Sequence, residues 1–226
     1  MLWIHILLVV AALMVGSVGQ WIVFDQTAPF FKTFDTKMKT EWICRVNAMI
    51  VDSLLVGFGT IEGHTSEWGL ATVVGYFIFD AIHMFLYDPT YLSGLAHHVV
   101  SMSVVGLGKL AMTDEQASSA TTAACILMST SPLLNLTWIL HKGGYSELPY
   151  FKYIAALMAV SYGVTRLGVL PWFMATKMDK VTAAVFLPLL GLSVYWFYKI
   201  AKMGQKFFMK GTSAEDALNS AQSHES

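Results

Sequence analysis

The chain has 226 residues, of which 55% are hydrophobic and 13% are charged, and its formal net charge at pH 7 is -1. Soluble domains carry about 25% charged residues, so this composition excludes an ordinary soluble protein. A near-neutral chain offers no strongly basic surface, and we expect no nucleic-acid partner. The apolar residues come in long blocks, which predicts an integral, multi-pass membrane protein.

A helix that spans a bilayer needs roughly 20 mainly apolar residues. Seven stretches meet this length, and they predict an all-α, polytopic fold with about seven transmembrane helices. In chain order, the predicted spans are Leu2–Phe24, Ile43–Thr60, Trp68–Tyr87, Leu92–Met112, Ala117–Leu140, Tyr150–Met174 and Val181–Met203. The second is the least apolar, because Arg45, Asn47 and Asp52 interrupt it. The first lacks the basic start and the cleavage site of a signal peptide, so we expect it to be retained.

Lysine and arginine gather on one side of the membrane in this topology. That side holds Lys32, Lys37, Lys39, Arg45, Lys142, Lys152, Lys199, Lys202, Lys206 and Lys210. The other side holds Lys109, Lys177 and Lys180. The bias predicts that the C-terminus is cytoplasmic and the N-terminus lumenal or extracellular. We therefore divide the chain into a transmembrane domain, 1–203, and a cytoplasmic tail, 204–226, whose polar, small-residue composition predicts disorder.

Four ionisable residues lie inside two neighbouring predicted spans. Asp80 and His83 belong to the third span and the adjacent His97 and His98 to the fourth, all at roughly 6–10 Å from the cytoplasmic end. Ionisable groups in hydrocarbon are costly and mark a functional site by default. Neighbouring residues on a helix point about 100° apart, so the two histidines cannot both face one atom. We predict a catalytic group of His97, His98 and Asp80, in which one histidine acts while the other orients it or lines a wall.

Five polar residues complete the predicted site as substrate-binding groups. They are His83, Asn47, Asp52, Asn135 and Arg166. The first four lie in the cytoplasmic half of their spans, which suggests a cavity open to the cytoplasm and to lipid. For the two asparagines, hydrogen bonds that hold helices together are an equal alternative. Arg166 stays charged near the middle of the sixth span, so it needs a carboxylate, a stack of carbonyls or a phosphate-bearing lipid. An internal ion pair with Asp52 or Asp80 and a contact to a headgroup or substrate are equal alternatives.

Three elements resemble the TLC-domain superfamily, which includes the ceramide synthases and a set of small TLC-domain-containing membrane proteins. The run 75–80, Gly-Tyr-Phe-Ile-Phe-Asp, precedes the histidine pair as it does in that family. The run 131–138, Ser-Pro-Leu-Leu-Asn-Leu-Thr-Trp, is similar to the family's Ser/Thr-Pro-Phe-x-Asn-x-Arg-Trp element. Trp42, Arg45 and Arg166 fit the pattern of the smaller members. The resemblance implies a TLC-type helical bundle.

The chain also departs from the family pattern. Smaller members tend to carry an acidic residue where this chain has Met128, and an arginine where it has Thr137. They also tend to have a histidine in the second span, near the position of Val51. The extended acidic motif that follows the histidine pair in ceramide synthases is absent from this sequence. These differences weaken the inference of ceramide synthase activity, in particular, from the family to this chain.

The resemblance implies a role in lipid metabolism or lipid homeostasis, with membrane lipids as partners. In the synthases, the histidine pair serves acyl transfer from acyl-CoA to a sphingoid amine. One hypothesis is therefore an enzyme that acylates a lipid amine or hydroxyl, with acyl-CoA as co-substrate and no other cofactor. Adjacent histidines are poor joint ligands for one ion, so we expect no metal. The family also suggests the endoplasmic reticulum or a connected membrane.

The other hypothesis is a non-catalytic lipid-binding protein: a sensor, a carrier or a regulator of membrane composition. The same polar cavity would then hold a headgroup. A proton-coupled transporter would also use aspartate and histidine in its spans, but the sequence lacks the internal repeat typical of transporters. The residues leave open whether the protein is an enzyme, and they give no oligomeric state.

Overall fold

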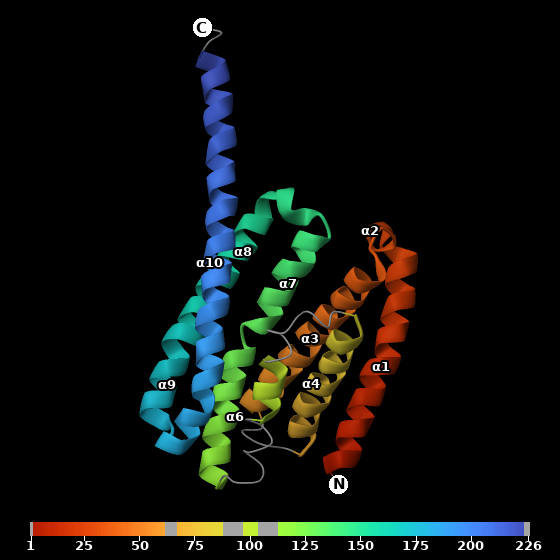
Figure 1. Ribbon diagram of the computed structural model, residues 1–226, viewed down its shortest axis with the longest axis vertical. Helices are drawn as coiled ribbons and strands as arrows, with labels where there is room; N and C mark the ends of the chain where they lie inside the picture. The colour runs from red at the N-terminus through yellow and green to blue at the C-terminus, as the bar shows by residue number, and fades with distance from the viewer. Residues whose placement is uncertain (1, 62–66, 88–96, 104–112, 224–226) are drawn as a thin grey trace.

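The computed structural model describes residues 2–61, 67–87, 97–103 and 113–223, and all regular structure in these ranges is helical (Figure 1). Residues 97–103 form a short helical segment. The other elements are α1 (Leu2–Thr27), α2 (Pro29–Lys32), α3 (Thr36–Ile61), α4 (Glu67–Tyr87), α6 (Asp114–Met128), α7 (Ser131–Lys142), a 3-10 turn η1 (Tyr145–Glu147), α8 (Pro149–Tyr162), a π-helix η2 (Gly163–Val169), α9 (Leu170–Lys177) and α10 (Lys180–Ser223). The all-α prediction is confirmed.

Four helical stretches of the described chain are long and apolar enough to cross a membrane. They are Trp3–Thr27, Ser118–Lys142, Pro149–Lys177 and Lys180–Gln205, and a shorter apolar helix covers Ala71–Leu86. The prediction of a polytopic membrane protein is confirmed. Helices lie at six of the seven predicted spans, and the structure describes residues 97–103 of the remaining one, so the number seven stays a prediction.

The helices pack as one bundle. α1 packs against α4, α4 against α3, α3 against α7 and α7 against α8 (Figure 1). α6, α9 and α10 share a second apolar core, and α6 also packs against α3, which joins the two parts of the bundle. Large apolar side chains on α1 point away from the bundle, among them Leu7 and Val15, which are 68% and 74% exposed. Exposing so much apolar surface to water would be unfavourable, and a bilayer removes that cost. The two chain ends lie at opposite ends of the bundle (Figure 1).

Two prolines interrupt helices near the middle of the bundle. Pro132 cannot donate a hydrogen bond to the carbonyl of Met128, and α6 ends at Met128 before α7 begins at Ser131. Pro171 stands at the start of α9, directly after the seven-residue π-helix η2. There, the N–H of Leu170 bonds the carbonyl of Thr165, five residues back. The wider turn makes room for the proline ring, which would clash with a regular α-helix.

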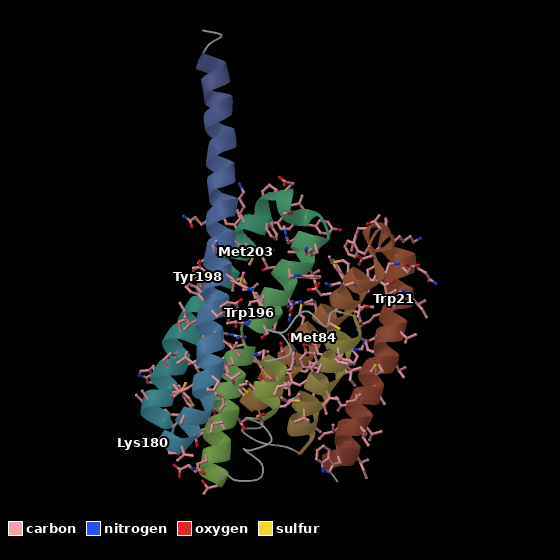
Figure 2. All side chains as sticks on the ribbon, in the orientation of Figure 1. Trp21, Met84, Lys180, Trp196, Tyr198 and Met203 are labelled. Carbon is pink, nitrogen blue, oxygen red and sulfur yellow. The ribbon has the colours of Figure 1, made fainter. Side chains whose placement is uncertain are left out.

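The last helix, α10, is longer than the sequence predicts. It passes beside the bundle as far as Met203 and then continues to Ser223, beyond the other helices (Figures 1 and 2). The division into a transmembrane domain, 1–203, and a disordered tail, 204–226, stays a prediction. Extending an existing helix avoids the cost of nucleation, and this segment contains the helix-favouring residues alanine, lysine, leucine and methionine. The placement of the tail in the cytoplasm stays a prediction.

Candidate functional site

The buried pair of Asp80 and His98 forms the centre of the site. Asp80 lies on α4 and His98 on the helical segment 97–103, and the Oδ2 atom of Asp80 is 2.9 Å from Nε2 of His98. Their side chains are 8% and 5% exposed. The structure therefore joins two residues that the sequence predicts to act together. A carboxylate at Nε2 orients the imidazole and stabilises its protonated form.

The second ring nitrogen of His98, Nδ1, is buried and has no hydrogen-bond partner among the described residues. If Asp80 accepts the Nε2 proton, Nδ1 carries the lone pair. The rings of Tyr76 and Phe77 enclose His98, with centroids 6.4 and 5.1 Å from the imidazole. The arrangement leaves one basic nitrogen for a further donor.

His97 lies differently from its neighbour. Its ring centroid is 5.5 Å from that of His98 and 6.3 Å from that of Phe77, in edge-to-face geometry. No hydrogen bond joins His97 to another residue within the described ranges, whereas His98 contacts Asp80. The two histidines thus have different surroundings, as the rotation between adjacent helix positions requires.

A second polar contact bridges α3 and α7. The Nη1 atom of Arg45 donates to Oδ1 of Asn135 over 3.1 Å. The same guanidinium lies 5.2 Å from the ring centre of Trp138 and 3.4 Å from a carboxylate oxygen of Glu41. Asn135 is buried, so this predicted substrate-binding residue joins two helices through Arg45.

A third group surrounds Arg166 on the π-helix η2. Arg166 donates from Nε to Oγ1 of Thr130 over 2.9 Å and from Nη2 to Oγ of Ser131 over 3.1 Å. Its guanidinium carbon lies 4.6 Å from the ring centre of Tyr162. Asp52, on α3, is also buried and interacts electrostatically with Arg166. The break before Pro132 and the π-turn before Pro171 bring these residues together.

Two predicted site residues have contacts elsewhere. Asn47 donates to Oγ of Ser17 over 2.9 Å and accepts from Nε2 of Gln20 over 2.8 Å, so it connects α3 with α1. His83 places Nδ1 2.9 Å from the carbonyl oxygen of Phe79, one turn back on α4. For Asn47, the alternative of a helix-joining hydrogen bond agrees with the geometry. The sequence reasoning missed its partners Ser17 and Gln20, because it treated the first span as uniformly apolar.

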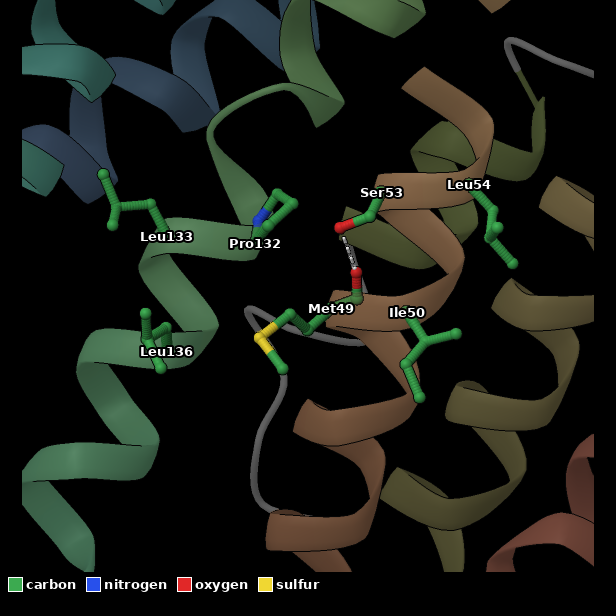
Figure 3. Close-up of a pocket in the computed structure, with 7 residues that line it drawn as sticks. All are labelled: Met49, Ile50, Ser53, Leu54, Pro132, Leu133 and Leu136. Atoms are coloured by element: carbon green, nitrogen blue, oxygen red, sulfur yellow. Dashed lines mark hydrogen bonds between the residues drawn. The ribbon is translucent and has the colours of Figure 1, made fainter. Parts of the chain in front are cut away.

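An apolar groove runs along the junction of α3 and α7 (Figure 3). It has a volume of 590 Å³, and its lining residues are Met49, Ile50, Ser53, Leu54, Pro132, Leu133 and Leu136. Ser53, its one hydroxyl side chain, donates to the carbonyl of Met49 within α3 (Figure 3). A groove of this composition suits a hydrocarbon chain rather than a polar solute.

A sequence model of the TLC domain matches residues 2–202. The chain belongs to the TLC-domain family. No curated protein and no solved structure matches it. The TLC domain indicates a general role in membrane lipid metabolism or homeostasis. The match includes every residue of the three polar groups described above.

Within the described ranges of this TLC domain, no group of three or more histidine, cysteine or acidic side chains is arranged to hold a metal ion. The donor groups that converge are instead an aspartate–histidine pair and an arginine among hydroxyl groups. Such groups can transfer a proton and bind an oxygen acceptor, respectively.

Proposed function

We propose that this TLC domain transfers an acyl group from acyl-CoA to a lipid amine or hydroxyl, with His98 as the general base. The observation that carries the proposal is the buried imidazole whose Nε2 contacts Asp80 while Nδ1 has no partner among the described residues. A histidine held in this way is oriented, and its free nitrogen can accept the proton of a bound acceptor.

In the proposed reaction, the lipid nitrogen or oxygen attacks the thioester carbonyl as Nδ1 of His98 removes its proton. A new C–N or C–O bond forms, the C–S bond breaks, and the thiolate of CoA takes the proton back from the imidazolium. Asp80 stabilises the imidazolium between these two transfers. His97 lines the wall beside His98, and the polar residues His83, Asn47, Asp52, Asn135 and Arg166 are assigned to holding the site and its substrate.

Acyl-CoA would reach the site from the cytoplasm. The loop that contains α2 and the C-terminal end of α7 lie at the same end of the bundle as the C-terminus (Figure 1), and Lys32, Lys142 and Lys202 belong to this end. A concentration of basic residues at one end supports a cytoplasmic C-terminus. Family membership supports the endoplasmic reticulum or a connected endomembrane as the location.

The test is turnover of labelled acyl-CoA by purified protein in lipid nanodiscs, with a panel of amine and hydroxyl lipids as acceptors. We expect His98→Ala to abolish product and Asp80→Asn to reduce kcat by about 10²-fold or more, because general-base catalysis contributes 10²–10⁴-fold. His97→Ala is the matched control and should retain more activity than His98→Ala. Equal, wild-type-like turnover in all three variants would exclude the proposal.

The apolar groove between α3 and α7 favours a second candidate, a non-catalytic lipid-binding protein that senses, carries or regulates membrane lipids. In this case, Asp80 and His98 form a buried pair that stabilises the fold. Copurified lipid would then be chemically unchanged, and His98→Ala would alter stability without altering any product.

A further inference from the structure

The imidazole of His98 needs a second support besides Asp80. The contact of 2.9 Å between Oδ2 of Asp80 and Nε2 holds one atom of the ring. Nε2 lies close to the axis about which the ring turns on its Cβ–Cγ bond, whereas Nδ1 lies further from this axis. The last torsion of a histidine side chain is broad, so a contact at Nε2 alone fixes the direction of the Nδ1 lone pair weakly. Nδ1 keeps one direction when a further group holds the plane of the ring.

Phe77 makes such a contact. Its ring centroid is 5.1 Å from that of His98, and the two ring planes meet at 68°. Aromatic rings prefer this edge-to-face arrangement at about 4.5–7 Å, because the edge of a ring is positive and its face negative. The rings of His97 and Tyr76 are more distant from His98, at 5.5 and 6.4 Å. Phe77 therefore holds the imidazole plane more directly than either of these neighbours.

The fold makes Phe77 a rigid support. Phe77 and Asp80 are three positions apart on α4, so their side chains leave the same face of the helix. Phe77 is buried in a core cluster that also contains Val51 of α3. Met102, one helical turn after His98, packs against the same cluster. The helix that carries His98 is thus held against α4 at two successive turns, and the phenyl ring has little freedom to move away from the imidazole.

We infer that Phe77 is a positioning residue for His98, whose ring plane it fixes so that the Nδ1 lone pair keeps one direction. The inference rests on the proposed function, because it names the side chain that aims the general base. Phe77 acts through His98 and takes no part in bond making itself. Misplacing a reacting group by about 1 Å can cost about 10²-fold in rate, so such a support bears directly on kcat. In ordinary core packing, by contrast, an apolar side chain of similar volume would serve as well as Phe77.

Pentafluorophenylalanine placed at position 77 separates the edge-to-face contact from packing. It keeps an aromatic ring in the core but reverses the charge distribution between the edge and the face of that ring, so the attraction to the imidazole of His98 becomes a repulsion. We expect kcat for acyl transfer to fall by about ten-fold. KM should change by less than about two-fold, because the contact orients the base and does not hold the substrate. Phe77→Leu should lower kcat by a similar factor and also lower the melting temperature, since it removes buried ring atoms.

Phe186, on α10, offers the matched control for lost packing. It is 1% exposed and belongs to a different core cluster, with Leu127 of α6 and Leu170 of α9. Phe186→Leu is the same chemical change at an equally buried site. We expect it to lower the melting temperature about as much as Phe77→Leu does and to leave kcat unchanged. A loss of kcat in Phe186→Leu equal to that in Phe77→Leu would show that general loosening of the core explains both, and would overturn the inference.

The ring order of His98 provides a second measurement, which needs no turnover. NMR of the full chain in nanodiscs, with isotope-labelled histidine and His98→Ala to assign the signal, reports how far the imidazole moves. We expect a rigid His98 ring in wild type and in Phe186→Leu, and a mobile one in the fluorinated protein and in Phe77→Leu. If wild type transfers no acyl group, the proposed function fails, whereas a mobile ring in the fluorinated protein still supports the positioning role. Unchanged ring order in the fluorinated protein, or unchanged kcat in it when wild type is active, would overturn the inference.

Discussion

Gly75 lies where α4 packs tightly against α1, and its replacement is a quantitative test of this packing. A Cβ atom at this position would lie 2.7 Å from Cγ1 and 2.9 Å from Cβ of Val9, and 3.3 Å from the carbonyl oxygen of Ile6. Carbon atoms pack at about 3.5–4.0 Å, so the two helices must separate by about 1 Å. Val9 is β-branched and stiff, and the Ile6 contact is backbone, so neither moves aside easily.

We expect Gly75→Ala to lower the free energy of unfolding by about 1–3 kcal/mol, the usual cost of overpacking. For a chain of this size, the melting temperature should fall by about 2–12 °C. Thermal unfolding in detergent, followed by fluorescence and size-exclusion chromatography, measures the effect. Val9→Ala in the same chain removes the nearest atom and should restore part of the loss.

Gly16→Ala is the matched control, because a Cβ built there has no packing neighbour within 4 Å beyond its own helix backbone. This change should leave the free energy of unfolding equal or raise it by up to about 1 kcal/mol, since alanine favours helix. Wild-type stability of Gly75→Ala, or no recovery when Val9→Ala is added to Gly75→Ala, would contradict this account of the α1–α4 packing.

Three further substitutions test the helix breaks, the polar helix contacts and one exposed cap. Pro171→Ala should let η2 relax toward a regular α-helix and move Arg166 away from its partners, seen as altered backbone protection in hydrogen exchange. Asn47→Ala should lower the free energy of unfolding by about 1 kcal/mol, from two membrane hydrogen bonds at roughly 0.6 each, measured by thermal unfolding in detergent. Asp179 caps α10 by accepting from backbone N–H groups and the hydroxyl of Thr182, which lower the pKa of its carboxyl. Because folding lowers this pKa, the ionised carboxyl of Asp179 stabilises the folded protein at pH values above its ordinary pKa near 3.8. This stabilisation is lost as the pH falls through the pKa of the folded state. The difference in melting temperature between wild type and Asp179→Ala should therefore disappear in acid.

The pairing of Asp80 with His98 could be predicted because two kinds of information agree there. Both residues interrupt apolar stretches, and helical rise places them at similar depth on neighbouring spans. Their motif also resembles the TLC family, to which the chain belongs. Depth and motif together select residues that can meet, and the structure places their side chains 2.9 Å apart.

The remaining site residues show where depth alone is insufficient. Depth does not tell which way a residue points around its helix, and the depth of Asn47 predicts a site residue, whereas its side chain contacts Ser17 on α1. The Arg166 group depends on a π-turn, whose local signal is Pro171 five residues later. The sequence shows this proline. The hydrogen-bond partners of Arg166, however, follow from the packing of η2 against the break between α6 and α7.

Acyl transfer by His98 is tested most directly by mass spectrometry of lipids from gently purified protein incubated with isotope-labelled acyl-CoA. Wild type should yield an acylated amine or hydroxyl lipid that carries the label, and His98→Ala should yield none while remaining folded. The same bound, unlabelled lipid in both proteins would contradict the claim and identify the Asp80–His98 pair as part of the lining of a lipid-binding protein.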